Sequence, residues 1–198
     1  MLSRILFALL LIFGAPLAGA RAEVSDEKVL GDPGASVTII EFASLSCPHC
    51  AEFHKTRFDW LKENYIDTGK VRFIFRDFPL NRPALLGSMV AHCAEPSKYF
   101  AYLSLLFKNQ EKWAFSQPVE EQLVKLARVS GMGQEKLLNC LQDAALAERI
   151  IQSRVESQNT YNIESTPSFL VGDQLLSLIH ISEPTRRTPI SYAVFCLK

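Results

Sequence analysis

Two cysteines that flank a proline and a histidine, in the run Cys47-Pro48-His49-Cys50, have the residue types and spacing best suited to chemistry in this chain. Thiols two residues apart can close into a disulfide and open again with little movement of the backbone. The apolar run Val37–Phe42 predicts a buried strand just before them, and helix-compatible sequence begins at Pro48. The spacing therefore predicts a redox pair at the junction between a strand and the helix that follows it.

The position of Cys47 at the start of that helix predicts an acidic thiol. Pro48 falls at the first helical position, where its fixed φ fits and its missing N–H costs nothing. Cys47 then faces unpaired backbone N–H groups and the positive end of the helix dipole, and both favour thiolate over thiol. Since a stabilised thiolate is a reluctant partner in a disulfide, we expect the oxidised pair to accept electrons readily.

The N-terminal segment 1–22 has the three parts of a secretory signal peptide. A basic residue lies near its start, an apolar run covers Ile5–Phe13, and residues 20–22 form a small-x-small cleavage site. We expect cleavage before Glu23 and a mature chain that works outside the cytosol, where disulfides persist; an uncleaved anchor is the alternative. The 21 basic and 21 acidic residues balance, so the composition does not indicate a nucleic-acid or anionic-membrane surface.

The C-terminal segment differs in kind from the rest of the chain. Residues 176–186 resemble, codon for codon, the translation of a transposase sequencing adapter, and residues 190–198 resemble the flow-cell primer region that follows one. Residues 187–189 fill the place of a sample index in the same frame. We therefore expect natural sequence to end near Leu175, with 176–198 a non-native tail that also accounts for the fifth cysteine, Cys196.

Residues 23–175 are enough for one compact α/β domain with its own core. The pattern predicts further strands at Val71–Phe75 and Ser168–Val171, a hairpin turn at Gly172-Asp173, and a helix from Pro48 to about Tyr65. Between them, about 81–161 reads as a helical insertion of four or five helices, punctuated at Pro96, Pro118 and Gly131-Met132-Gly133. An insertion of this length is too large for a loop and predicts a packed helical subdomain.

Several of these signals, in this order, resemble the DsbA family of thioredoxin-fold thiol oxidases of the bacterial periplasm, which implies a periplasmic location for this chain. They are the signal peptide, the Cys-Pro-His-Cys motif after Val-Thr-Ile-Ile-Glu-Phe, the Phe-Arg-Asp-Phe-Pro run at 75–79, the helical insertion, and Thr166-Pro167 before a strand. The resemblance covers about Val29–Leu175. It implies a thioredoxin fold with a large helical insertion, from which the family's last strand and C-terminal helix are missing in this chain.

The resemblance also implies roles for the residues of the motif. Cys47 would be the exposed nucleophile and Cys50 its buried partner, while Pro48 and His49 would tune the redox potential. For the cysteines, half of a structural zinc site is the alternative, although the sequence supplies no second pair of ligands at a suitable spacing. For His49, the alternative is a solvated helix residue without a redox role.

Three further residues receive roles from the resemblance alone. Glu41 would be a buried carboxylate beneath Cys50 that passes protons to or from it, and Pro167 would be a cis proline beside the disulfide. The backbone of Thr166 would then be offered to an extended substrate strand. Strand alternation leaves a solvated Glu41 open, and an ordinary trans Pro167 is the alternative reading, since most X–Pro bonds are trans.

The helical insertion contributes a second pair of cysteines, Cys93 and Cys140, which we expect to form a structural disulfide in an oxidising compartment. Buried free thiols are the alternative. His54 and His92 are interpreted as ordinary helix residues, because nothing in the sequence pairs with them.

Together these features predict an oxidase that introduces disulfides into secreted proteins through Cys47 and Cys50. The expected partners are unfolded proteins with free thiols and, by family analogy, a DsbB-like membrane quinone reductase that reoxidises the chain. We expect a monomer without cofactor or metal. A disulfide isomerase or reductase of the same fold is one alternative, and a non-enzymatic metal-binding or holdase module is the other.

Overall fold

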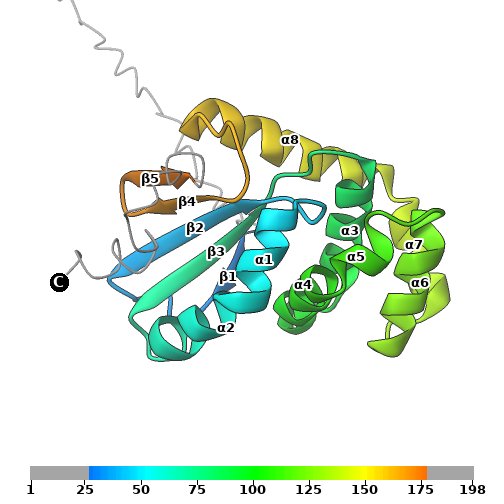
Figure 1. Ribbon diagram of the computed structural model, residues 1–198, viewed down its shortest axis with the longest axis horizontal. Coiled ribbons are helices and arrows are strands. Elements are labelled where there is room, and N and C mark those ends of the chain that lie inside the picture. The colour runs from blue at the N-terminus through cyan, green and yellow to red at the C-terminus, as the bar shows by residue number, and fades with distance from the viewer. Residues whose placement is uncertain (1–26, 178–198) are drawn as a thin grey trace, which may run out of the picture.

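A computed structural model describes residues 27–177, which form a five-stranded sheet flanked by helices (Figure 1). The sheet has the order β1-β3-β2-β4-β5, in which β2 and β3 are parallel and the other neighbours are antiparallel. The β-branched and aromatic side chains of β2 and β3 suit a pleated, buried surface. The strands are β1 (Lys28–Leu30), β2 (Val37–Ala43), β3 (Val71–Asp77), β4 (Ser168–Val171) and β5 (Gln174–Ser177). This mixed architecture confirms the predicted α/β class.

The sheet has two strands more than the sequence pattern led us to expect. Strand β1 has only three residues, which is too short for its alternation to stand out, and it pairs with β3. Strand β5, Gln174–Ser177, pairs with β4 across the hairpin turn that the sequence predicts at Gly172-Asp173. The turn that allows this is at Gly172, whose φ of 57° suits glycine. The signal segment 1–22 and residues 178–198 of the expected tail lie outside the described residues.

The helix after the redox motif is shorter than predicted. Helix α1 covers Pro48–Thr56 and is interrupted at Arg57, whose backbone (φ −124°, ψ −32°) departs from helical geometry. Helix α2 (Phe58–Leu61) and a π-helical turn, η1 (Lys62–Ile66), complete the connection to β3. No proline or glycine marks Arg57, so the interruption has no local signal in the sequence.

The predicted helical insertion is present, with six α-helices in place of four or five. The additional breaks lie at Asn109 and at the Gln142-Asp143 step, neither of which contains proline or glycine. At the second break, the Asp143 side chain accepts a hydrogen bond from the Leu146 backbone N–H and so caps the next helix. The elements are α3 (Arg82–Cys93), a 3-10 turn η2 (Pro96–Lys98), α4 (Tyr99–Lys108), α5 (Gln110–Trp113), α6 (Val119–Val129), α7 (Gln134–Leu141) and α8 (Ala144–Tyr161).

Both faces of the central sheet are buried. On β2, Ile39 and Ala43 contribute to a large core shared with α1 and the helical insertion, while Ile40 and Phe42 join a smaller core with Ile163 on the other face. Helix α8 runs from the helical insertion back toward β4 and packs against β3 (Figure 1). Burial on both faces means that every β2 side chain beyond Thr38, including any polar one, lies in the interior.

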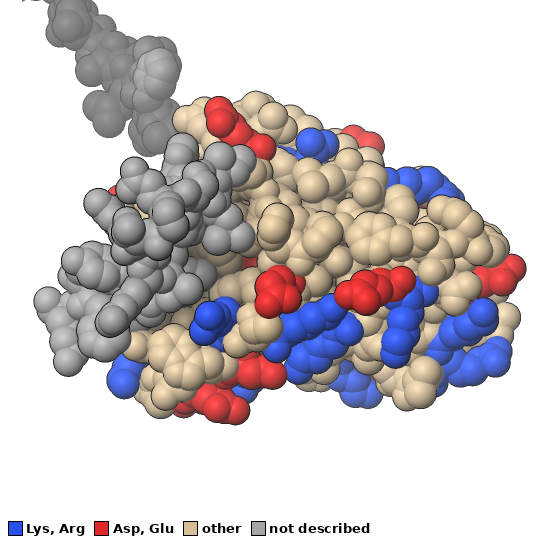
Figure 2. Space-filling model, viewed as in Figure 1, with Lys and Arg blue, Asp and Glu red and all other residues tan. Residues whose placement is uncertain are grey.

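The surface carries charges of both signs. On the face shown in Figure 2, lysine and arginine side chains gather along the lower margin, over the helical insertion, with acidic side chains interleaved among them. Within residues 27–177, no helix is long and apolar enough to cross a bilayer.

Candidate active site

The two cysteines of the motif lie where β2 leads into α1, as the sequence predicts, but they differ in exposure. Cys47 is the N-cap residue of α1, with extended backbone geometry, and Pro48 is the first residue of the helix. Cys47 is 7% exposed and Cys50 is fully buried, and both are free thiols in this structure. Of the two cysteines, only Cys47 keeps any exposed surface.

The surroundings of Cys47 stabilise its thiolate. The pKa of Cys47 is lowered to about 5, chiefly by a hydrogen bond from the Cys50 thiol; burial opposes the shift. A hydrogen bond from Thr166 and the backbone N–H groups of Cys50 and His49 lower the pKa further. These N–H groups belong to the first turn of α1, where they have no partner within the helix. At neutral pH, the reduced site therefore holds a thiolate at Cys47.

The surroundings of Cys50 have the opposite effect. Burial raises its pKa well above the ordinary value, and the hydrogen bond that it donates to Cys47 adds to the increase. The negative charges of Cys47 and Glu41 act in the same direction. Cys50 thus keeps its proton when Cys47 has lost its own, so the two sulfurs have separate protonation states.

Glu41 is a fully buried carboxylate on β2 and forms a pair with His54 of α1. The distances from His54 Nε2 to the two carboxylate oxygens are 3.1 and 2.9 Å, and His54 is 1% exposed. The alternative that Glu41 is a solvated strand residue is wrong, because both faces of β2 are buried. The interpretation of His54 as an unpartnered helix residue is also wrong. The signal that could have revealed it is the spacing from Cys50, since residues four apart share one face of a helix.

Aromatic rings enclose the Glu41–His54 pair. The His54 ring stacks on Phe107 with a centroid distance of 4.1 Å and an interplanar angle of 12°, and it also contacts the rings of Phe53, Phe58 and Phe75. His54 Nδ1 is buried and has no partner among the described residues. The pair is thus a polar group in an apolar environment, one helical turn from Cys50.

The loop before β4 lies against the reactive sulfur. The Thr166–Pro167 peptide bond is cis, and the Cys47 thiol donates to the Thr166 carbonyl oxygen at 3.3 Å. In this protonated form, Thr166 Oγ1 is buried and has no partner within the described part of the chain. A thiolate can accept a hydrogen bond from that hydroxyl, which agrees with the lowering of the Cys47 pKa by Thr166. Pro48 and His49 are exposed at the surface of the site.

The second pair of cysteines lies away from this site. Cys93, the last residue of α3, is joined by a disulfide to Cys140 of α7, with a Cα–Cα distance of 6.1 Å. The interpretation of the neighbouring His92 as an ordinary helix residue without a partner is wrong. Its Nε2 lies 2.7 Å from Asp77 Oδ2. Burial opposes ionisation of Asp77, but the charge of His92 and hydrogen bonds from His92, Ser88 and Tyr99 lower its pKa.

A cavity of about 600 Å³ lies beside this pair, between β3 and α8, and neither Cys47 nor Cys50 lines it. Among residues 27–177, no three His, Cys, Asp or Glu side chains come together in a group that could hold a metal ion.

Comparison with known proteins agrees with the fold. A family model described as Thioredoxin matches residues 23–185. The crystal structure of a variant of alpha-DsbA1 from Wolbachia pipientis is 33% identical, with a TM-score of 0.71, and the match covers 75% of each chain. The crystal structure of a protein-disulfide isomerase from Novosphingobium aromaticivorans is 26% identical, with a TM-score of 0.68, over 76% of this chain and 89% of that one.

A protein of Rickettsia felis, provisionally named a protein-disulfide oxidoreductase, is 31% identical over 148 residues, or 74% of this chain. The match covers 53% of the Rickettsia protein, so the chain spans about half the length of the curated relatives first matched. Given the family match, the sheet order and the Wolbachia likeness, the chain belongs to the thioredoxin family and is a DsbA-like member of it.

Proposed function

We propose that the chain is a thiol:disulfide oxidoreductase that uses Cys47 and Cys50 as its redox pair, and that it works as an oxidase of secreted proteins. The observation that carries the proposal is the contrast between the two sulfurs. Cys47 is 7% exposed and has a pKa of about 5, whereas Cys50 is fully buried and has a raised pKa. A sulfur that is stable as a thiolate leaves a disulfide easily, so the Cys47–Cys50 disulfide is a strong electron acceptor.

The reaction would begin with the oxidised pair. A substrate thiolate attacks Cys47 Sγ, which forms a mixed disulfide and breaks the Cys47–Cys50 bond. The bonding electrons go to the Cys50 sulfur, whose raised pKa makes it take up a proton. A second substrate thiolate then attacks the substrate sulfur of the mixed disulfide. The substrate leaves with a disulfide, and the chain keeps two more electrons, with Cys47 as thiolate and Cys50 as thiol.

Other groups around the cysteines support this sequence of steps. The buried carboxylate of Glu41, held by His54, is the proposed path for the proton that Cys50 gains and later loses. The Thr166 backbone lies beside Cys47, where an extended substrate strand would add hydrogen bonds. His49, which is exposed and lies between the two cysteines in the sequence, would add positive charge near the thiolate when protonated.

The cellular setting belongs to the same proposal. The signal-like segment 1–22 favours work in the periplasm on unfolded proteins with free thiols. A DsbB-like membrane quinone reductase would return the reduced pair to the disulfide. We propose that the chain works as a monomer.

Isomerase activity is the second candidate, since a relative named a protein-disulfide isomerase shares the fold and 26% of the sequence. Two assays separate the candidates. The oxidised chain is expected to form disulfides in a reduced, unfolded substrate faster than it rearranges a scrambled one. Its equilibrium with glutathione should favour the dithiol form. An equilibrium that favours the disulfide, with rearrangement faster than oxidation, would reject the oxidase in favour of the isomerase.

A further inference from the structure

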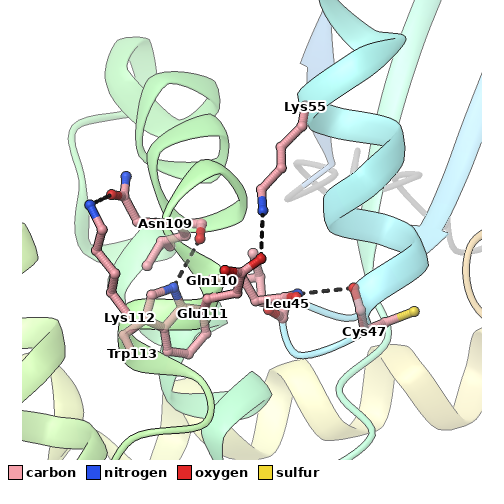
Figure 3. Close-up of polar contacts among 9 residues, drawn as sticks. Leu45, Cys47, Lys55, Asn109, Gln110, Glu111, Lys112 and Trp113 are labelled. Atoms are coloured by element: carbon pink, nitrogen blue, oxygen red, sulfur yellow. Dashed lines mark hydrogen bonds and ion pairs between the residues drawn. The ribbon is translucent and has the colours of Figure 1, made fainter.

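Gln110 is a buried polar side chain to which the steps above give no role. It is the first residue of α5 and is 2% exposed. Its Nε2 donates to the carbonyl oxygens of Leu45, at 2.8 Å, and of Cys47, at 2.9 Å (Figure 3). Both carbonyls belong to the segment between β2 and α1. One amide from the helical insertion therefore bonds twice to the segment that presents the reactive sulfur.

That segment is held by a second set of bonds as well. The Cys47 backbone N–H donates to the Ser44 carbonyl at 3.0 Å, and the Leu80 N–H, beyond β3, donates to Ser44 Oγ at 3.4 Å. The loop is buried, and a buried carbonyl that loses its partner is costly, so the loop conformation depends on these bonds. Through Gln110, the helical insertion contributes hydrogen bonds that hold this loop.

Helix α5 is itself firmly placed. Trp113, three residues after Gln110, is 1% exposed, and its Nε1 donates to the Leu106 carbonyl at 2.9 Å. A Cβ added to Gly87 of α3 would lie 2.6 Å from the Trp113 ring and 3.3 Å from Leu45 Cδ1. The indole thus packs against α3 with no spare room, beside the loop that Gln110 binds. The position of the Gln110 amide follows from the packing of the insertion.

We propose that Gln110 is a positioning residue of the redox site, which fixes the Leu45 and Cys47 carbonyls and so couples the helical insertion to the geometry at the Cys47 sulfur. A carbonyl oxygen is the negative end of a peptide dipole. While the Cys47 carbonyl is bound to Gln110, the backbone N–H groups of His49 and Cys50 remain directed at the sulfur. Without the amide, the Cys47 carbonyl keeps its α1 bond from the Ala51 N–H, at 3.1 Å, but the Leu45 carbonyl loses the Gln110 donor, so the loop before α1 can shift and these N–H groups lose part of their alignment.

The significance of this inference rests on the proposed oxidoreductase function, but its test does not require turnover. In the reduced full chain, the absorbance of the Cys47 thiolate near 240 nm is followed against pH. Gln110→Met keeps the length of the side chain and removes both donors. We expect its titration midpoint to rise by about one pH unit, and its equilibrium with glutathione to shift about tenfold toward the disulfide.

Two control variants isolate the role of the amide. Glu111→Gln removes the neighbouring, exposed ion pair with Lys55 and leaves the loop contacts intact, so the midpoint should not move. Leu123→Ala loosens the buried core of the insertion without touching the loop, and it reports on general destabilisation. If Gln110→Met fails to fold, Gln110→Asn, whose amide is one carbon shorter, should raise the midpoint by a smaller amount.

A rise in Gln110→Met or Gln110→Asn that both controls lack supports the inference. An unchanged midpoint in the Gln110 variants, or an equal rise in Leu123→Ala, overturns it. Failure of the wild-type chain to oxidise substrate would reject the proposed function and leave the titration to decide the inference on its own.

Discussion

The chemistry of the site, at the scale of single residues, comes from giving two identical side chains different surroundings. Cys47 receives hydrogen bonds from Cys50, Thr166 and two backbone N–H groups, which stabilise its negative charge. Cys50 is buried beside Cys47 and Glu41, whose charges oppose a second ionisation. The motif alone indicated the first effect, because helix starts stabilise anions. The second effect comes chiefly from the burial of Cys50, with Cys47 next and a smaller contribution from Glu41, whose own burial the strand pattern left open.

The low pKa of Cys47 predicts how the stability of the reduced form depends on pH. The thiolate pKa is about 5 in the folded state and 9.0 for the unperturbed thiol. Because the folded-state value is the lower one, the thiolate contribution is absent below pH 5, grows as the pH rises, and is complete above pH 9. At pH 7 it amounts to roughly 2–3 kcal/mol.

Urea unfolding of the reduced and oxidised proteins at pH 4.5 and pH 7 measures this contribution. The stability of the reduced form relative to the oxidised form should increase between the two values, and reduced Cys47→Ser should lack the increase. A difference that does not change with pH would contradict the assigned acidity.

The Glu41–His54 pair gives a second prediction at the residue scale. His54→Phe fits the aromatic surroundings but leaves the Glu41 carboxyl buried without its partner, which should cost about 3–5 kcal/mol. The double variant Glu41→Leu/His54→Phe removes both polar groups and should be more stable than His54→Phe alone. Chemical denaturation of the two singles and the double completes the cycle, and additive losses would show that the pair is not coupled.

At the scale of elements, the contact between α3 and α5 places the helical insertion against the redox loop. Gly87→Ala should destabilise the protein by about 1–3 kcal/mol, because the added methyl group meets the fully buried Trp113 ring. Gly133→Ala is the matched control, since nothing lies within 4 Å of an added Cβ there. Thermal unfolding compares the two, and equal stabilities would mean that the indole can move aside.

The sequence predicted the elements that have strong local signals. Apolar β-branched runs marked β2, β3 and β4, and the Gly172-Asp173 turn marked the hairpin. Strand β1 was missed because three residues carry too little pattern. Breaks in the helices at Arg57 and Asn109 were missed because tertiary packing, and not proline or glycine, sets them. For the same reason, the Gln110 bonds to the loop could not be predicted, since they join residues more than 60 positions apart.

At the scale of the whole molecule, the Cys93–Cys140 disulfide ties α3 to α7 within the insertion. It joins residues 47 positions apart, and a loop of that length should contribute about 3–4 kcal/mol by limiting the unfolded chain. The double variant Cys93→Ser/Cys140→Ser, with Cys47–Cys50 oxidised in both proteins, should unfold at lower urea concentration by that amount. Equal midpoints would show that packing alone holds the two helices together.

The difference in exposure between Cys47 and Cys50 also determines which covalent products can form. In a Cys196→Ser chain that keeps the Cys93–Cys140 disulfide, iodoacetamide added to the folded protein with a reduced Cys47–Cys50 pair should alkylate one sulfur per molecule, and peptide mapping should find the label on residue 47. With Cys50→Ala, the internal thiol that could release a bound substrate is gone, so mixed disulfides should persist on non-reducing gels. The Cys50→Ala substitution would thus leave Cys47 as the one reactive sulfur of the pair and would trap, as mixed disulfides, the proteins that react with the chain.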